Sequence, residues 1–133
     1  MITLNIEIDG KGYELNFGFG FLRALNDKYK VRKNGQDIGA GLAMTTGYLI
    51  DSDPLVLPDI VEAGLHHVKK DKPGKEKIEE ALMAIIEEKG VEEVSEGFLN
   101  TFRESALTSK KVKQAEEQIE KQQKKAKEQA ENQ

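Results

Sequence analysis

Residues 2–17 alternate apolar and polar side chains in two runs, and this pattern constrains the fold more than any other feature. The apolar positions are Ile2, Leu4, Ile6 and Ile8 in the first run, and Tyr13, Leu15 and Phe17 in the second. A period of two is typical of strands with one buried face. Residues 9–12 (DGKG) supply the glycines that tight hairpin turns need. We therefore expect a β-hairpin whose apolar face is covered, because a lone hairpin is marginal in water.

Helical spacing in the rest of the chain predicts the elements that cover the hairpin. Apolar residues recur there at every third or fourth position. The stripes are Phe21, Leu22, Leu25, Tyr29; Ile38, Leu42, Thr45, Leu49; Leu57, Ile60, Val61, Gly64, Leu65, Val68; Ile78, Leu82, Ile85, Ile86; and Val91, Val94, Phe98, Phe102. Residues 30–37 (KVRKNGQD) indicate a polar connection with a turn at Asn34-Gly35. Pro58 fits the first turn of its helix, and Gly90 ends another. The predicted fold class is α+β: an N-terminal β-hairpin packed on a bundle of about five short helices, with a polar helix-prone C-terminal tail.

A change in composition near residue 109 suggests the domain organisation. Residues 1–108 are expected to form a single α+β domain, and residues 109–133 a charged Lys/Glu/Gln-rich tail. In the tail Val112, Ala115 and Ile119 stand at coiled-coil spacing, but Gln122 and Gln129 interrupt the seam. So few apolar residues cannot offset the entropy of ordering about 24 residues. We expect a solvated helix or a disordered segment.

The charge distribution argues against nucleic acid as a partner. The net charge of −4 divides into −6 for residues 1–109, with thirteen basic and nineteen acidic residues, and +2 for residues 110–133, with seven Lys and five Glu. Phosphate binding depends on clustered Lys and Arg.

The longest apolar runs are far shorter than the ~20 residues of a membrane span. The start MITLNIEI also lacks the pattern of a signal peptide. We expect a soluble protein that is not exported.

A Gly-x-Gly step in residues 13–25 (YELNFGFGFLRAL) raises the alternative of a dinucleotide-binding loop. Such loops need a third small residue, so that the helix packs closely on its strand. Arg23 stands at that position, and the preceding strand is half of a hairpin. We therefore interpret Gly18 and Gly20 as a corner that lays the next helix across the hairpin.

A second group of small residues lies in residues 39–47 (GAGLAMTTG). The Lys-Ser/Thr of a phosphate-binding P-loop does not follow it. Small residues permit close approach of a neighbouring backbone, although the glycines among them lower helix propensity. We interpret the segment as a site of tight packing.

No residue pattern points to catalysis, a metal or a cofactor. The chain has no cysteine, and its two histidines, His66 and His67, are adjacent, so they point about 100° apart on a helix. No nucleophile elbow is present. The carboxylates cluster on polar helical faces, as in Glu79-Glu80 and Glu87-Glu88, instead of in apolar pockets. We expect no enzymatic activity, no metal and no cofactor.

The order of segments resembles a known family. Residues 6–29 (IEIDGKGYELNFGFGFLRALNDKY), 39–50 (GAGLAMTTGYLI) and 51–68 (DSDPLVLPDIVEAGLHHV) precede an acidic helical half and the tail. This arrangement is similar to the tail assembly chaperones of long-tailed bacteriophages and of prophages of Gram-positive bacteria. The resemblance covers residues 2–107, and its most telling parts are GxYELNFGFGFLR and SDPLVLPDIV.

The resemblance implies a role in virion assembly. Members of this family are not enzymes; they bind the long, apolar-rich, helical tape measure protein, keep it soluble and help to recruit tail tube subunits. They act in the host bacterial cytoplasm and are absent from the mature virion. Self-association is compatible with this role. The alternatives are another phage morphogenesis adaptor, or a small ligand-binding protein or enzyme whose site the sequence does not reveal.

The resemblance brings no binding motif, so candidate contacts come from the residues themselves. Adjacent Phe98 and Leu99 cannot both face inward from a helix with a single apolar stripe, so the helix containing Phe98, Leu99 and Phe102 is one candidate surface. Phe19 is the other. If it continues the strand pattern of Phe17 it belongs to the core, which we favour; otherwise it is an exposed anchor.

Overall fold

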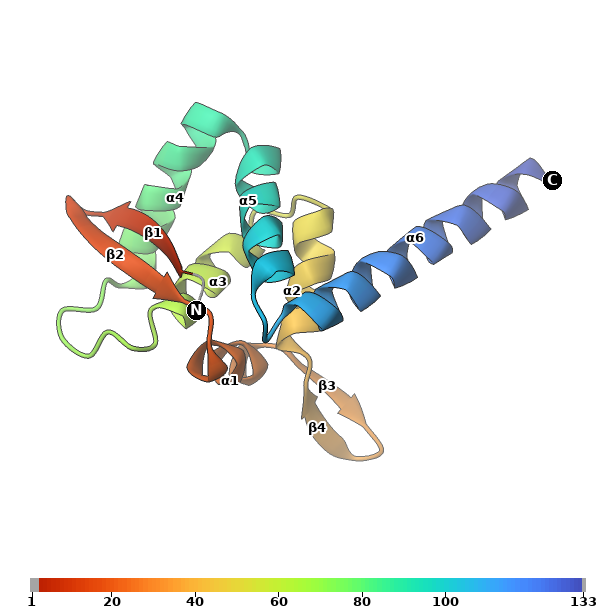
Figure 1. Cartoon of the computed structure of the whole chain (residues 1–133), viewed down its shortest axis with the longest axis horizontal. Coiled ribbons are helices and arrows are strands. Elements are labelled where there is room, and N and C mark those ends of the chain that lie inside the picture. Colours follow the sequence, from red (N-terminus) through yellow and green to blue (C-terminus); the bar gives the residue numbers. More distant parts are fainter. Residues whose placement is uncertain (1–2, 133) are drawn as a thin grey trace.

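The computed structural model describes residues 3–132, which form two β-hairpins and six α-helices (Figure 1). The strands are β1 (Thr3–Ile8), β2 (Lys11–Asn16), β3 (Lys30–Lys33) and β4 (Gln36–Gly39). The helices are α1 (Phe19–Lys28), α2 (Gly41–Ile50), α3 (Val56–Gly64), α4 (Lys75–Lys89), α5 (Val91–Glu104) and α6 (Ser109–Glu131). The predicted α+β class is confirmed.

The N-terminal hairpin is the predicted one. Strands β1 and β2 are antiparallel, with Ile8 opposite Lys11, and Asp9 and Gly10 form the turn. Both turn residues have positive φ, 52° and 78°, as a type I′ turn requires. Ile6, Ile8 and Leu15 are buried, whereas Ile2 lies outside the described residues. Helices α3 and α4 cover this hairpin.

The Gly18–Gly20 corner leads directly into α1. The Asn16 side chain accepts a hydrogen bond from the Gly18 amide (3.0 Å), and Gly18 is the N-cap. Gly20 has no unusual φ, but a Cβ there would lie 2.2 Å from the His66 ring, so a larger residue requires that ring to shift. The corner brings two aromatic rings, of Phe17 and Phe21, to 4.9 Å.

The centre of the core is an aromatic cluster. Phe102 of α5 joins Phe17 and Phe21, each ring pair 5.7 Å apart, and all three side chains are fully buried. Such edge-to-face and tilted pairs add to the stabilisation from burial. The cluster therefore ties the N-terminal corner to the last helix of the body.

The interpretation of residues 30–37 as a plain connection was wrong. The turn at Asn34-Gly35 is present, with φ of 54° and 78°, but it closes a second hairpin, β3–β4. Ile38 was expected in a helical stripe and instead lies in β4, 43% exposed and opposite Val31. Only two apolar residues alternate here, too few to distinguish a strand from a loop. Figure 1 shows this hairpin projecting from the body below α1 and α2.

The helix boundaries follow local signals. Pro58 stands in the first turn of α3, and Gly90, with φ of 88°, separates α4 from α5. Both features were predicted. Helix α5 lies in the middle of the body, in contact with α2, α4 and α6 (Figure 1). It therefore has more than one buried side.

The tail forms one continuous helix, α6, whose base packs on α2 and α5. Val112 is fully buried in the common core, and the hydroxyl of buried Thr108 donates to the Phe102 carbonyl at 2.6 Å. Residues 120–132 are exposed, and Figure 1 shows the helix extending away from the body. The first turns of α6 are thus packed, whereas the domain boundary at 108/109 stays a prediction.

Candidate protein-binding surfaces

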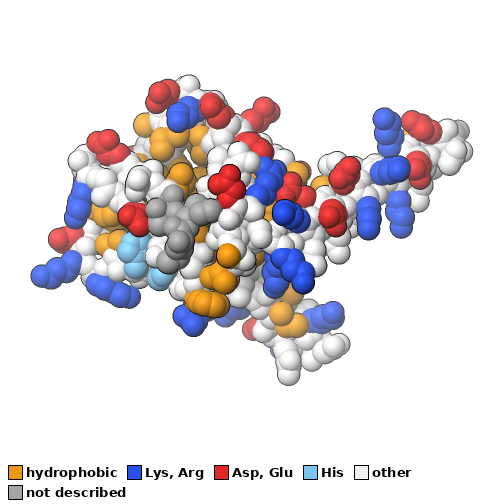
Figure 2. All heavy atoms as spheres, viewed as in Figure 1, with side chains coloured by type: hydrophobic (Ala, Val, Ile, Leu, Met, Phe, Trp, Pro, Cys, Tyr) orange, Lys and Arg blue, Asp and Glu red, His pale blue; other side chains and the backbone are white. Residues whose placement is uncertain are grey.

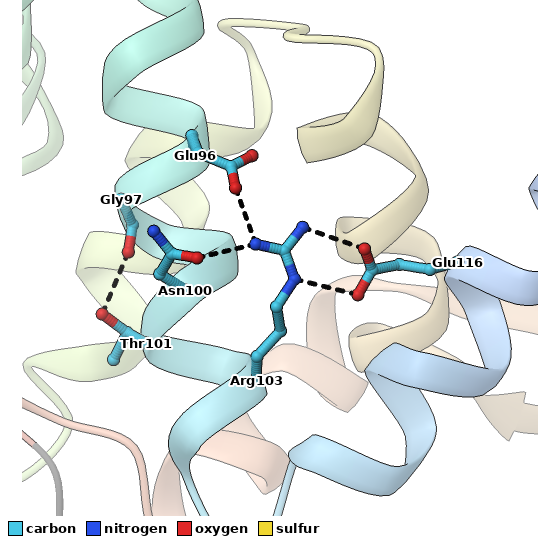
Figure 3. Close-up of polar contacts among 6 residues, drawn as sticks. All are labelled: Glu96, Gly97, Asn100, Thr101, Arg103 and Glu116. Atoms are coloured by element: carbon cyan, nitrogen blue, oxygen red, sulfur yellow. Dashed lines mark hydrogen bonds and ion pairs between the residues drawn. The ribbon is translucent and has the colours of Figure 1, made fainter.

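The base of α6 is held by Arg103, as Figure 3 shows. Its guanidinium donates two hydrogen bonds to the Glu116 carboxylate, at 3.0 and 2.9 Å. A further nitrogen donates to Glu96 (2.6 Å) and to Asn100 (2.7 Å). Hydrogen bonding of the guanidinium to the Glu116 carboxylate, and then to the Glu96 carboxylate, raises the pKa of Arg103. A planar guanidinium suits this bidentate geometry, so Arg103 ties α5 to the base of α6.

The space between α2, α5 and the base of α6 is an acidic groove of about 650 Å³. Its lining residues are Leu49, Ile50, Ser52, Glu92, Glu93, Glu96, Leu99, Arg103, Glu116, Ile119, Glu120 and Gln123. Five Glu and one Arg give this lining a net charge of −4. The floor is aliphatic, and the glutamates come from α5 on one wall and α6 on the other.

A second groove, of about 480 Å³, lies along α2 and α6 and is largely apolar. It is lined by Ala43, Met44, Gly47, Tyr48, Asp51, Ile119, Gln122, Gln123 and Ala126. Helix α2 carries no charged residue from Gly41 to Ile50, so apolar and small side chains reach its outer face. Tyr48 is 37% exposed there. We call this surface the α2 groove.

A third and smaller groove, of about 300 Å³, separates β1 from α4 and α5. It is lined by Leu4, Asn5, Ile6, Leu15, Leu82, Ile85, Lys89, Glu93, Val94, Gly97 and Phe98. We call it the hairpin groove. Phe98 is buried at its base.

The premise that Phe98 and Leu99 cannot both face inward was wrong. Phe98, Leu99 and Phe102 are all buried, at 4%, 3% and 0% exposure. Phe98 faces the hairpin groove, Leu99 the floor of the acidic groove and Phe102 the aromatic cluster. Because neighbouring helices cover α5 on several sides, adjacent residues can both point into protein.

Phe19 is exposed, at 65%, so its preferred placement in the core was wrong. Helix α1 begins at Phe19, and two residues span about 200° on a helix, so Phe19 points away from buried Phe21. The strand period that would have kept both on one face ends before this residue. Phe19 remains available as an anchor for a partner.

Sequence reasoning missed the α2 groove, although its signal was visible. The small side chains in residues 39–47 indicated tight packing against a neighbouring backbone. That holds for Gly41, where a Cβ would lie 2.6 Å from the Leu25 Cβ, and for Gly39 against Asn26. At Gly47 an added Cβ would meet nothing within 4 Å. The uncharged run of α2 was the observation that could have indicated an open apolar face.

Residues 3–132 contain no candidate metal site and no candidate membrane span. No three His, Asp or Glu side chains there are grouped as a metal ion would require. Within the same residues, no helix is both long and apolar enough to cross a membrane. Away from α6, the Tyr29 hydroxyl donates a short hydrogen bond to the Asp59 carboxylate, at 2.6 Å. Burial, and then this hydrogen bond, raises the pKa of Tyr29.

An α+β frame with open grooves between helices is the architecture of a protein that can bind helical segments of a partner. Comparison with protein families identifies the family to which the chain belongs. The family model described as phage tail assembly chaperone protein, TAC, matches residues 5–130, and the chain belongs to this family. The match confirms the resemblance and also includes α6. Comparisons with curated proteins and with solved structures found no match.

Proposed function

We propose that this protein is a tail assembly chaperone that binds the tape measure protein, keeps it soluble and helps to recruit tail tube subunits. It acts in the host bacterial cytoplasm, without catalysis, and is absent from the finished virion. The family membership supports the general role. The observation that carries the proposed contact is the uncharged, partly uncovered face of α2.

The partner chemistry suits this face. A long helical protein with much apolar surface exposes stripes that aggregate unless they are covered. Amphipathic helices bind in apolar grooves through anchors at helical spacing. The α2 groove is lined by Ala43 and Gly47, which leave room for a neighbouring helix, and by the larger apolar side chains of Met44 and Tyr48. A helix of the tape measure protein is therefore the occupant we propose.

The test is co-expression with the tape measure protein of the same phage or prophage, comparing wild type with Gly47→Glu. The substitution places a charge in the groove without a steric conflict, since nothing lies within 4 Å of a Cβ there. Replacing a glycine inside a helix also favours the fold, by up to about 1 kcal/mol. We expect wild type to keep the partner soluble, and Gly47→Glu to fold normally but lose this activity.

Gly97→Glu is the matched control. Gly97 lies within α5, lines the hairpin groove, and would likewise place a Cβ in open space. It should solubilise the partner as wild type does. Full activity of Gly47→Glu, or loss of activity only in Gly97→Glu, would contradict the proposed contact. Failure of the wild type to solubilise or co-purify with the partner would refute the proposed function itself.

A further inference from the structure

The projecting part of α6 has two different faces. At 100° per residue, the six charged residues of 121–131 fall on one side of the helix, and the Gln and Ala residues on the other. The uncharged stripe consists of Gln122, Gln123, Ala126, Gln129 and Ala130. In the view of Figure 2 the projecting part shows mainly Lys and Glu side chains.

The uncharged stripe is covered at the base of α6 and uncovered beyond it. Toward the base it continues through Ile119 and Ala115, which are half-buried, to Val112, which is fully buried. All of residues 120–132 are exposed. An isolated helix of about 11 residues is marginal in water, so the projecting turns gain stability from any surface that covers this stripe.

The acidic groove is complementary to this segment in charge. Residues 121–132 contain four Lys and two Glu, a net charge of +2, whereas the groove lining carries −4. The complementarity extends to shape. The small side chains of Ala126 and Ala130 can approach the aliphatic floor of the groove closely, and the glutamines beside them are uncharged. The lysines on the flanks then reach the glutamates of both walls.

We propose that the acidic groove of one copy binds the projecting part of α6 from a second copy. Gln122, Gln123 and Ala126 of this segment also line the α2 groove, so the second copy and the tape measure helix compete for the same stripe. The acidic groove lies at the base of α6 in one copy, and it is filled by the projecting part of α6, here called the tip, of the other copy. Two copies paired tip to base therefore place their α6 helices antiparallel, and each fills the groove of the other. Such a reciprocal contact closes with two-fold symmetry, which limits the assembly to a dimer.

The test is sedimentation of the full chain over a roughly hundredfold range of concentration. Wild type should shift from the 14.9 kDa monomer to twice that mass. The dimer should weaken when ionic strength rises from about 0.05 to about 0.5 M, because the screening length falls. A monomer throughout at low salt overturns the proposal.

Charge reversal identifies the two surfaces. The tip variant is Lys121→Glu/Lys124→Glu/Lys125→Glu, and the groove variant is Glu92→Lys/Glu93→Lys, which leaves the Arg103 contacts intact. Each alone should raise the dimer dissociation constant at least about tenfold. Mixed together, the two variants restore one complementary contact, because the wild-type tip of the groove variant meets the wild-type groove of the tip variant. They should therefore form a heterodimer that is tighter than either variant alone. Circular dichroism of each variant confirms that α6 is still helical.

A second basic element provides the control. The β3–β4 hairpin carries Lys30, Arg32, Lys33 and Asp37, a charge of +2, and is exposed along its length. Lys30→Glu/Lys33→Glu should leave the dimer unchanged. If this variant dissociates the dimer, or if mixing the tip and groove variants restores nothing, the interface is elsewhere and the inference is wrong.

Discussion

Replacing Arg103 with Met should loosen α6 without unfolding the body. The substitution keeps an aliphatic stem of similar length and removes the guanidinium. It deletes the two hydrogen bonds to Glu116, at 3.0 and 2.9 Å, and the bond to Glu96 at 2.6 Å. The acidic groove would then contain five Glu and no compensating cation.

The magnitude follows from exposure. Arg103 and Glu116 side chains are each 29% exposed and Glu96 is 54% exposed, so the contacts are neither fully solvated nor buried. Exposed ion pairs contribute about 0.2–1 kcal/mol, and bidentate geometry is stronger. We assign about 1 kcal/mol to the Glu116 pair and about 0.5 kcal/mol to the Glu96 pair. Local opening of α6 should therefore become easier by about 1.5 kcal/mol, roughly tenfold.

Native-state hydrogen exchange measures this opening. Amides of residues 113–123 should lose protection roughly tenfold, while those of α3 keep theirs. Arg32→Met is the control, since the Arg32–Asp37 pair has side-chain exposures of 72% and 58%. It should change stability by less than about 0.5 kcal/mol. Unchanged protection of α6 in Arg103→Met, or an equal loss in α3, would refute the view that Arg103 specifically anchors this helix.

Three further substitutions test the core, a polar pair and a close contact. Phe102→Ala should lower the free energy of unfolding in urea by about 3–5 kcal/mol, because it leaves a cavity in the aromatic cluster. Phe19→Ala, at an exposed position, should change it by about 0.5 kcal/mol or less. Similar effects of the two would contradict the burial of Phe102 and the exposure of Phe19. Tyr29→Phe should cost about 1 kcal/mol at neutral pH through the lost hydrogen bond. Because the folded state raises the Tyr29 pKa, the contribution of Tyr29 to stability is complete below pH 10.0 and declines as the pH rises further. Tyr29→Phe should therefore lose less stability than wild type in alkaline solution. Parallel curves of unfolding free energy against pH would exclude this linkage. Gly20→Ala should destabilise the fold by about 1 kcal/mol through contact with the His66 ring. In a His66→Ala background the same substitution should stabilise the fold, because only the gain in helix propensity remains. A stability change of the same sign in both backgrounds would refute the contact.

Features that depend on a few neighbouring residues followed from the sequence. The turns at Asp9-Gly10 and Asn34-Gly35 and the break at Gly90 depend on positive φ, which is a local property. The first hairpin and the α+β class followed from apolar periodicity, which records the faces that must be buried. The family resemblance was likewise carried by the order of segments, and the family match confirms it.

Only the tertiary structure decided which faces of each helix are buried and where the grooves lie. The sequence indicates that α5 has an apolar stripe, but contact with α2, α4 and α6 is what buries both Phe98 and Leu99. The start of α1 turns Phe19 outward. The acidic groove joins residues of α2 to residues of α5 and α6, which lie far from α2 in the chain. Periodicity reports which residues avoid water, whereas a groove depends on where packed helices diverge, and that is determined by long-range contacts.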